Sequence, residues 1–360
     1  MRVRLEEVCE KESSKLKQSD VIDQNGLYPV YGASGYLGNI NTYHQSNYYV
    51  AVVKDGAGIG RAMLLPPKSS IIGTMQYLIP KDNILPEYLY YVVKAKHLEK
   101  YFSGATIPHI YFKDYKNEQF DLVSFEEQRE IINRIKKIET IIDNLSKNLV
   151  LLDELVKARF VEMFGNVQEA KKYGGKQLKD ICNTVTGGTP STKHAEYYNG
   201  TIPWISTVSL GPNYIDGTTA KAFITQEAVN NSSTKIIPSG SILFGTRVGV
   251  GKSSINQVEM CTNQDIVAII DLDESKYNKL FIKYVLDTYQ SYFNSIKKGA
   301  TILGISSDDL KNIYIPEATL CNQNRFEEFV EEIDKSRSRI QKSLEASQEL
   351  FDSLMQEYFG

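Results

Sequence analysis

The sequence predicts an α+β protein with two β-rich globular domains in a pseudo-twofold tandem repeat, separated by two long antiparallel coiled-coil helices. Three observations support this prediction. Residues 125–164 hold an unbroken apolar heptad, and a second copy of that stretch follows 195 residues later. Each copy is preceded by sequence rich in glycine and aromatic residues, with short strand-like runs.

The first long helix is predicted from apolar residues that recur at alternating intervals of four and three, which is the seam of a coiled coil. This seam consists of Ile131, Ile135, Ile138, Ile142, Leu145, Leu149, Leu152 and Val156. Forty residues at about 1.5 Å each give a helix of roughly 60 Å. The second copy keeps the register with two polar interruptions, Arg337 and Ser347, so we expect the two helices to pair.

The repeat also covers the globular parts and sets the domain boundaries. Residues 104–107 (Gly-Ala-Thr-Ile) match residues 299–302, and Gln128 matches Gln323. We expect a first globular domain at 1–124, a first helix at 125–165, a linker at 166–175, a second globular domain at 176–319 and a second helix at 320–360. The chain is therefore a duplication of one unit, a globule followed by a helix.

Within each globular domain, a buried strand leads into a glycine-rich hairpin, at residues 54–61 in the first and 244–252 in the second. We expect one strand over residues 71–79. Helical spacing follows at residues 86–102 and 278–296. The loops of the two domains differ, which is expected if one framework reads two different ligands.

The composition is that of an ordinary globular protein, with 42% hydrophobic and 24% charged residues in a chain of 360. The longest aliphatic run, residues 266–270, is too short to span a membrane, and charges replace the apolar segment of a signal peptide at the amino terminus. We therefore expect a cytoplasmic protein. The four cysteines and four histidines are scattered, so no metal site is predicted.

We find no catalytic motif. Gly251, Lys252 and Ser253 resemble the end of a phosphate-binding loop, but Thr246 stands where its first glycine should be and the stretch continues as a strand. Rossmann, metalloprotease and nucleophile-elbow motifs are missing as well. We therefore expect this chain to bind no cofactor of its own and to catalyse no reaction.

Charge limits how this chain could bind nucleic acid. The net charge is −3, and each globular domain is only slightly positive, while the acidity lies in the second helix. A DNA-binding domain that acts alone usually has a large positive excess. If this chain holds DNA, another subunit is expected to supply much of the contact with phosphates.

The glycine hairpins present basic residues that could contact bases or phosphates, because Arg and Lys pair with guanine O6 and N7. The same residues could equally point into water from structural turns. Gln76 and the Asn263–Gln264 pair each follow a threonine in an apparently matching place, and amides can pair with adenine. Buried amides that tie strands together are an equally good explanation.

We take as candidate DNA-binding residues the polar, basic and aromatic side chains predicted at loop tips and hairpins. They are Tyr31, Ser34, Tyr36, Lys54, Arg61, Gln76, Thr106, His109, Thr189, Ser191, Thr192, Lys193, Ser206, Arg247, Lys252, Asn263, Gln264 and Thr301.

The architecture and several motifs resemble the specificity subunit of Type I restriction-modification systems. The resemblance rests on the repeated Gly-Ala-Thr-Ile segment, on the helix entry at residues 125–132 (Phe-Glu-Glu-Gln-Arg-Glu-Ile-Ile) and on residues 151–155 (Leu-Leu-Asp-Glu-Leu). It implies that the globules are target recognition domains, each reading half of a split double-stranded DNA site, with the paired helices holding them apart.

The resemblance also implies partners. Two modification subunits would bring S-adenosylmethionine and adenine methylation, and restriction subunits could join with ATP and Mg for cleavage. The long helices carry apolar residues off the seam that could contact a partner or helices of the globules. The candidate partner-binding residues are Gln128, Arg129, Ile132, Ile141, Leu151, Leu155, Gln323, Phe329 and Leu350. An alternative is a coiled-coil scaffold whose globules bind protein or glycan, which the nearly neutral globules and 23 tyrosines would suit.

Overall fold

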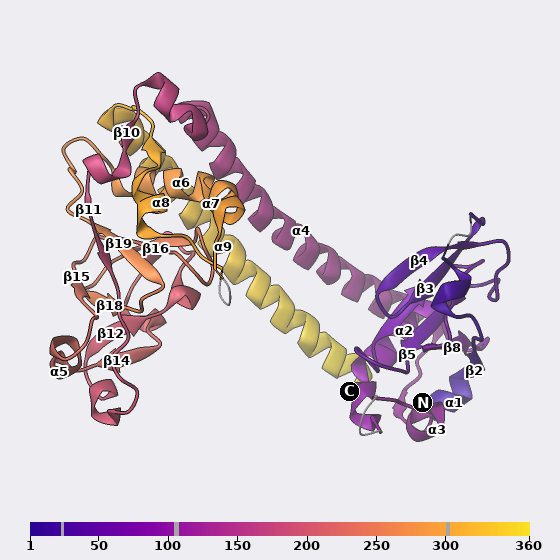
Figure 1. Ribbon diagram of the computed structural model, residues 1–360. Helices are drawn as coiled ribbons and strands as arrows, with labels where there is room; N and C mark the ends of the chain where they lie inside the picture. The colour runs from indigo at the N-terminus through magenta and orange to yellow at the C-terminus, as the bar shows by residue number, and fades with distance from the viewer. Residues whose placement is uncertain (23–24, 104–107, 300–302) are drawn as a thin grey trace. The chain divides into compact units, whose positions relative to one another are not determined.

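The computed structural model describes residues 1–22, 25–103, 108–299 and 303–360, which form two compact units (Figure 1). The first unit is Met1–Asn148 with Arg339–Gly360, and the second is Leu149–Ser338. Two 40-residue helices, α4 (Phe125–Phe164) and α9 (Leu320–Phe359), each contribute one part to each unit.

The first unit is built on an antiparallel four-stranded sheet in the order β2 (Cys9–Ser13), β8 (Met75–Pro80), β5 (Tyr49–Val53) and β6 (Ala62–Leu65). A second sheet has the order β4 (Gly35–Ile40), β3 (Tyr28–Gly32) and β7 (Ser70–Ile71), with β3 and β7 parallel. The strands β1 (Arg2–Arg4) and β9 (Gln119–Asp121) pair separately. The short helices are α1 (Leu5–Val8), η1 (Gln18–Asp20), α2 (Pro86–Ala95), η2 (Leu98–Tyr101) and α3 (Phe112–Tyr115).

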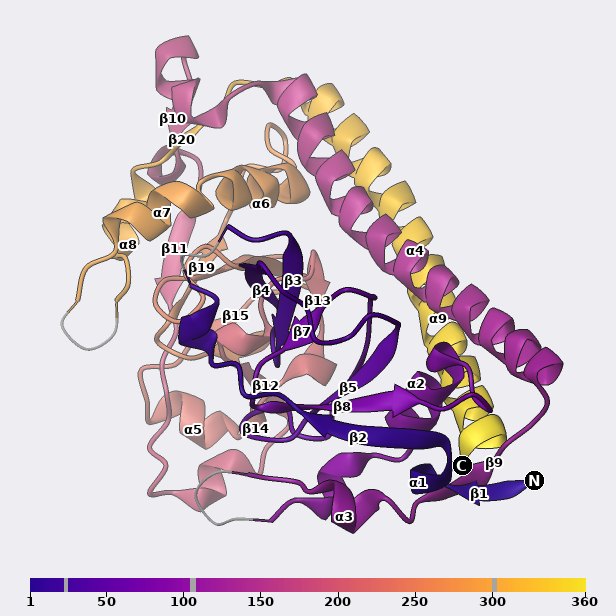
Figure 2. The ribbon, with the colours of Figure 1, turned by 90° about the vertical axis from the view of Figure 1, so that its right-hand side faces the viewer.

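The central strand β5 is completely buried and supplies two cores, because successive side chains of a strand point to opposite faces. Val50 and Val52 join the core formed with α2, which lies against β5 and β6 (Figure 2). Tyr49 and Val53 join the core formed with residues of the second sheet. Burial on both faces explains why this strand reads as a continuous apolar run.

The second unit repeats this plan with additions. Its larger sheet has the order β11 (Asn183–Thr186), β19 (Ile266–Ile270), β16 (Ile242–Gly245), β17 (Ser253–Asn256) and β13 (Tyr214–Ile215). Its smaller sheet has the order β14 (Ala222–Ile224), β12 (Ile202–Ile205), β18 (Met260–Thr262) and β15 (Ile236–Ile237), with β12 and β18 parallel. The strands β10 (Lys176–Gln177) and β20 (Tyr314–Ile315) pair as β1 and β9 do.

Helical segments of the second unit complete the repeat. They are η3 (Val167–Tyr173), η4 (Leu178–Asp180), η5 (Ala195–Tyr198), η6 (Thr207–Ser209), η7 (Gly217–Thr219), α5 (Gln226–Asn230), α6 (Lys279–Thr288), α7 (Gln290–Ile296) and α8 (Ser307–Lys311). The central strand β16 again supplies two cores: Ile242 and Phe244 face α6, and Leu243 faces the smaller sheet.

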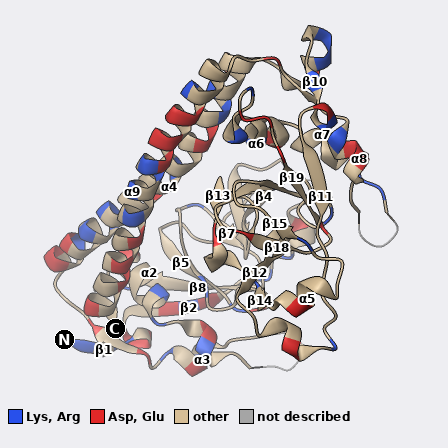
Figure 3. Cartoon of the chain, turned by 90° about the vertical axis from the view of Figure 1, so that its left-hand side faces the viewer, with Lys and Arg blue, Asp and Glu red and all other residues tan. Residues whose placement is uncertain are grey.

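The long helices pack antiparallel within each unit. In the first unit, Arg134 of α4 donates to the hydroxyl of Tyr358 over 3.1 Å, and residues of both helices share one core, with Ile135 and Phe351 among them. In the second, Asp153 pairs with Arg337 at 2.7 Å, and the rings of Phe160 and Phe326 lie 5.2 Å apart. Residue numbers rise along one helix as they fall along the other, so the predicted antiparallel pairing is confirmed. Acidic and basic residues both occur along these helices (Figure 3).

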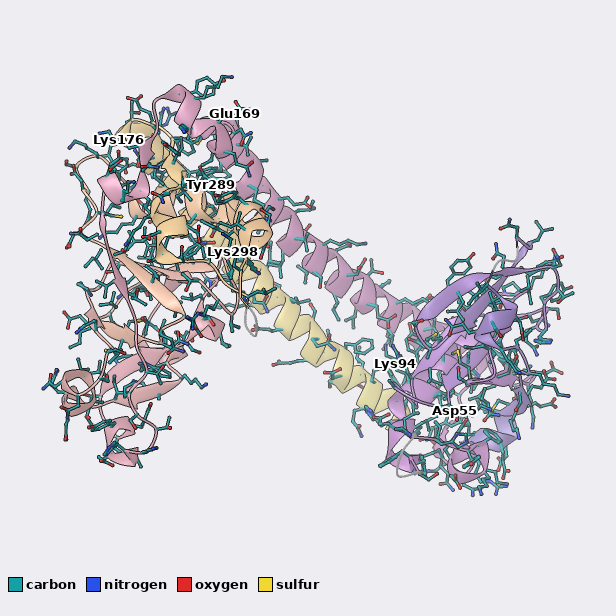
Figure 4. All side chains as sticks on the ribbon, viewed as in Figure 1. Asp55, Lys94, Glu169, Lys176, Tyr289 and Lys298 are labelled. Carbon is teal, nitrogen blue, oxygen red and sulfur yellow. The ribbon has the colours of Figure 1, made fainter. Side chains whose placement is uncertain are left out.

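The structure divides three predicted elements. A turn separates β7 from β8 within residues 71–79. The helix predicted at 86–102 ends at Ala95, because His97 takes the left-handed conformation (φ 48°) before η2 begins. The helix predicted at 278–296 consists of α6 and α7. The stretch expected as a linker contains η3, whose Val167 is buried and accepts a hydrogen bond from the hydroxyl of Tyr289. Tyr289 is labelled in Figure 4.

One match between the repeats was wrong. Gln76 lies opposite Val52 and Ser13 in its sheet, whereas the residue in that place in the second unit is Val267, opposite Phe244 and Thr186. The parallel strands agree with this offset, since Ile71 and Thr262 are equivalent. Asn263 and Gln264 therefore lie in a turn, at the places of Ile72 and Gly73, and have no relation to Gln76.

In the described part of the chain, no helix is long and apolar enough to cross a membrane. Within the same residues, no group of three or more His, Cys, Asp or Glu side chains could hold a metal ion.

Candidate nucleic-acid interface

The glycine loop of the second unit, residues 246–252, connects β16 to β17 and presents two of the predicted basic residues. Gly249 and Gly251 have φ values of 68° and 89°, a backbone conformation that residues other than glycine rarely adopt. The amides of Gly251 and Lys252 donate to the carbonyls of Gly245 and Gly249, which closes the loop. Arg247 and Lys252 are exposed on it. The backbone thus holds the loop in one shape while these two side chains remain accessible.

A turn between β18 and β19 lies against this loop and brings three further residues to it. Arg247 Nη1 lies 3.5 Å from Asp265 Oδ1, and Asn263 Nδ2 lies 3.3 Å from Asp265 Oδ2. The hydroxyl of Thr189 donates to Gln264 Oε1 over 2.5 Å. The structure therefore brings the predicted residues Arg247 and Asn263 to one carboxylate that we did not predict, and pairs the predicted Thr189 with Gln264 of the same turn.

The polar insertion after β11 supplies the remaining candidates of the second unit. Ser191, Thr192 and Lys193 are exposed, and the Gly188 amide anchors the insertion to the carbonyl of Thr262. Trp204 is buried in the core of the second unit, and its indole nitrogen donates to the Gly188 carbonyl. Ser206 is buried. Its burial makes it a poor candidate for contact with DNA, which corrects that expectation.

The glycine loop of the first unit, residues 54–61, connects β5 to β6 in the same way. Lys54 is half-buried, Arg61 is exposed, and Asp55 contacts Nδ1 of His109. Asp55 is labelled in Figure 4.

The second sheet of this unit carries further candidates. The ring centroids of Tyr31 and Tyr36 lie 6.2 Å apart in an edge-to-face contact, and Tyr36 and Ser34 are exposed. Burial raises the pKa of Tyr31, so its hydroxyl stays protonated and available as a donor.

Gln76 is a further correction in the first unit. It is buried, its Oε1 accepts from the hydroxyl of Tyr115 at 3.3 Å, and its Nε2 lies 3.5 Å from the Glu12 carbonyl. A central-strand amide with these partners ties the core together and has no access to a base. Thr106 and Thr301 lie outside the described residues.

The same backbone contact fixes the glycine loop in both units. The amide of Ile110 donates to the Lys54 carbonyl over 2.9 Å, and the amide of Ile305 donates to the Thr246 carbonyl over 2.8 Å. Just before each contact, the chain forms a matched bridge, between Ser103 and His109 and between Lys298 and Gly304. These bridges bracket the repeated Gly-Ala-Thr-Ile segments. Lys298, labelled in Figure 4, adds a second cation near Arg247 in a groove that both residues line.

The candidate partner-binding residues fall into two groups. Gln128 and Gln323 are completely buried, and Ile132 is 5% exposed in the core of the first unit. The structure corrects the expectation that these three side chains meet another protein. Phe329 is partly buried under Arg159, whose guanidinium lies 5.8 Å from the ring. By contrast, the side chains of Arg129, Ile141, Leu151, Leu155 and Leu350 are exposed.

Cys9 and Cys261 are unreactive thiols. Burial raises the pKa of Cys9 to about 12 and that of Cys261 to about 11, which disfavours the thiolate. Their thiols pack in the cores of their units.

The class of protein that the fold defines is a duplicated framework, with basic and amide side chains on the loops of two related units. The model of the Type I restriction modification DNA specificity domain matches residues 1–152 and 171–348, so the chain belongs to this family. This confirms the predicted class, a specificity subunit of a Type I restriction-modification system.

Two relatives cover half of the chain. The MjaIX specificity subunit of a Type I restriction enzyme from Methanocaldococcus jannaschii is 31% identical over 180 residues, 48% of this chain and 42% of the relative. The EcoR124I/EcoR124II specificity subunit of a Type I restriction enzyme from Escherichia coli is 32% identical over 185 residues, which are 49% of this chain and 44% of the relative. The matches thus span less than half the length of these relatives.

Solved structures share the fold over the whole chain. A crystal structure of a Type I restriction-modification S subunit from M. genitalium has a TM-score of 0.60 at 14% identity and covers 100% of this chain and 96% of its own. A second structure comes from work on complex assembly and conformational transition of the type I restriction-modification system. It has a TM-score of 0.58 at 15% identity, and the match covers 100% of this chain and 97% of that chain. The predicted fold class is confirmed.

Proposed function

We propose that this chain reads a double-stranded DNA target in two parts, one with each unit, and directs partner adenine methyltransferase and restriction subunits to it. The observation that carries the proposal is the glycine loop, held by the same backbone contact in both units but bearing different side chains: Lys54 and Asp55 in one, Thr246 and Arg247 in the other. A fixed framework with variable polar tips suits recognition of two different sequences.

The charge balance supports a shared grip on DNA. The net charge of −3 provides little attraction for phosphates, so partner subunits would contribute most of it. In this proposal two modification subunits supply S-adenosylmethionine, and restriction subunits supply ATP and Mg. As domain boundaries we propose those expected from the sequence, with recognition domains at 1–124 and 176–319. The cytoplasmic location stays a prediction.

The direct test is a band shift with the chain, the modification subunit and duplexes that contain or lack a site found by mapping methylated adenines. We expect retention of the duplex with the site only. Equal retention of both duplexes would contradict sequence reading, and a scaffold that binds protein or glycan would retain neither.

A second experiment tests whether the paired helices set the distance between half-sites. Four residues are inserted in α4 between Ile142 and Leu149, and four in α9 between Arg337 and Leu344, the equivalent places in the repeat. Each helix becomes about 6 Å longer and keeps its seam facing approximately the same way. We expect unchanged half-sites that are one or two base pairs farther apart, two being the upper limit at 3.4 Å per pair. Unchanged spacing would show that the helices are not the spacer.

A further inference from the structure

The two units present opposite charges at one equivalent position of the glycine loop. The carbonyls of Lys54 and Thr246 accept the same backbone hydrogen bond, so the next residues, Asp55 and Arg247, are structural equivalents. Strand pairing gives the same answer, because Val53 lies opposite Met75 and Gly245 lies opposite Ile266. A carboxylate in one unit thus replaces a guanidinium in the other.

Arg247 is exposed but has a fixed neighbour. Its side chain is 53% exposed, whereas the side chain of Asp265, whose Oδ1 lies 3.5 Å from Arg247 Nη1, is only 14% exposed. Because the arginine is exposed to water, the pair contributes little to folding. A carboxylate that orients the planar guanidinium would, however, restrict the directions in which its remaining N–H groups point.

Asp265 is itself anchored to the loop that carries Arg247. Its backbone carbonyl accepts from the amide of Thr246 at 2.8 Å and from the Thr246 hydroxyl at 3.0 Å. Its amide donates to Asn263 Oδ1 and its Oδ2 accepts from Asn263 Nδ2, both at 3.3 Å. The residue before Arg247 and the carboxylate beside it are therefore tied together and hold the arginine from two sides.

The first unit has no such arrangement among its described residues. The residue equivalent to Asp265 is Thr74, whose carbonyl accepts from the Lys54 amide at 3.0 Å. Asp55, in the place of Arg247, contacts His109, whose ring lies 4.0 Å from that of Tyr111. An acceptor at this position cannot pair with guanine O6 and N7, which are acceptors themselves.

We propose that Asp265 is a positioning residue that aims Arg247 at a guanine in the half-site read by the second unit, so that this pair determines specificity there. The proposal rests on the proposed function. A bidentate contact from arginine to guanine discriminates against other bases by about tenfold to a hundredfold. Because the first unit has Asp55 in the equivalent place, its half-site is read at that position by a different pairing.

The test maps methylated sites in cells that carry the full complex with Arg247→Lys, Arg247→Gln or Asp265→Asn. The control is Asp273→Asn, which removes a carboxylate from a surface ion pair of the same unit, formed with Lys276 at 2.6 Å. Arg247→Lys retains the positive charge but loses the planar fork. Arg247→Gln removes both the charge and the fork. It therefore changes the base preference if Arg247 reads a base, and leaves the consensus unchanged if Arg247 contacts only phosphate.

We expect both Arg247 variants and Asp265→Asn to relax the preference for guanine at one and the same base pair, by about tenfold to a hundredfold, with the other half-site and the control unchanged. An unchanged consensus in Arg247→Gln would show a phosphate contact and overturn the proposal. So would an effect of Asp265→Asn at a different base pair or in the other half-site. If Asp265→Asn fails to fold, Asp265→Glu takes its place, and the same comparison with Arg247→Lys decides the question. If the wild-type complex methylates no defined site, the proposed function fails first, and this inference with it.

Discussion

Gln128 and Gln323, 195 positions apart in the sequence, make the same three hydrogen bonds in their two units. Gln128 Oε1 accepts from the Leu85 amide at 2.8 Å, and its Nε2 donates to the carbonyls of Asn83 and Val123. Gln323 Oε1 accepts from the Asn278 amide at 2.8 Å, and its Nε2 donates to the carbonyls of Lys276 and Ala318. Each glutamine thereby fixes the start of a long helix to the segment before the helix of its globule.

The first prediction follows from the burial of these amides. Gln128→Leu removes one acceptor and two donor interactions and leaves buried backbone groups unpaired, so we expect a loss of about 2 to 4 kcal/mol of stability in the first unit. Hydrogen exchange followed by mass spectrometry would show faster exchange in peptides that contain Leu85 and Val123. Gln341→Leu, at an exposed place on α9, is the control and should change nothing. Unchanged protection around Leu85 would contradict the role assigned to Gln128.

A second prediction concerns the end of α9. Phe359 is buried against Tyr88 and Tyr91 of α2, and its carbonyl accepts from Lys96 Nζ over 2.6 Å. Phe359→Ala should cost about 3 to 5 kcal/mol because it leaves a cavity in the core of the first unit. Urea unfolding followed by circular dichroism measures this loss. Leu350→Ala, half-exposed on the same helix, should cost less than about 0.5 kcal/mol, and equal losses in both variants would refute this packing.

The seam of the long helices could be predicted because one periodic pattern in one element reports its buried face. Ile135, Ile138 and Val156 are buried, as the heptad requires. Ile132 was harder to assign, because it packs in the core that α4 shares with the globule, which the helix pattern does not describe. Off-seam apolar residues looked alike in the sequence, whether covered by the same chain, as Ile132 is, or exposed, as Leu151 is.

The recognition loops could be located but their internal contacts could not. Glycines that need positive φ marked residues 54–61 and 244–252. Asp265 was missed because its contact with Arg247 joins two loops that connect different pairs of strands. In addition, the two repeats were matched at a threonine followed by an amide, which placed this turn three residues out of register. A register taken from the buried strands, Val53 with Gly245 and Met75 with Ile266, would have placed Asp265 beside the loop.

The third prediction uses the pKa values of the thiols. Burial raises the pKa of Cys9 to about 12 and of Cys261 to about 11, so at pH 8 both are thiols and unreactive, and their labelling should rise only as the pH approaches those values. Cys321 is exposed and should react first. Intact mass spectrometry after brief iodoacetamide treatment at pH 8 should show one modification, whereas the chain in denaturant should show four. Labelling of Cys261 in the native chain as fast as that of Cys321 would contradict the assigned burial.

The last prediction concerns the exposed apolar residues of α4 in the second unit. Leu151 and Leu155 are 57% and 47% exposed and four positions apart, so they lie on one face of the helix. In the proposed function a modification subunit covers this face. The double change Leu151→Ser with Leu155→Ser should then leave the fold intact and weaken binding of that subunit by about tenfold or more, since burial of each leucine contributes about 1.5 to 3 kcal/mol. Surface plasmon resonance with immobilised modification subunit measures the affinity.

The control for a general loss of surface hydrophobicity is Val208→Ser, which removes an apolar side chain that is 82% exposed on the globule of the same unit. Equal affinity in the double variant and the wild type would place the partner elsewhere on the chain.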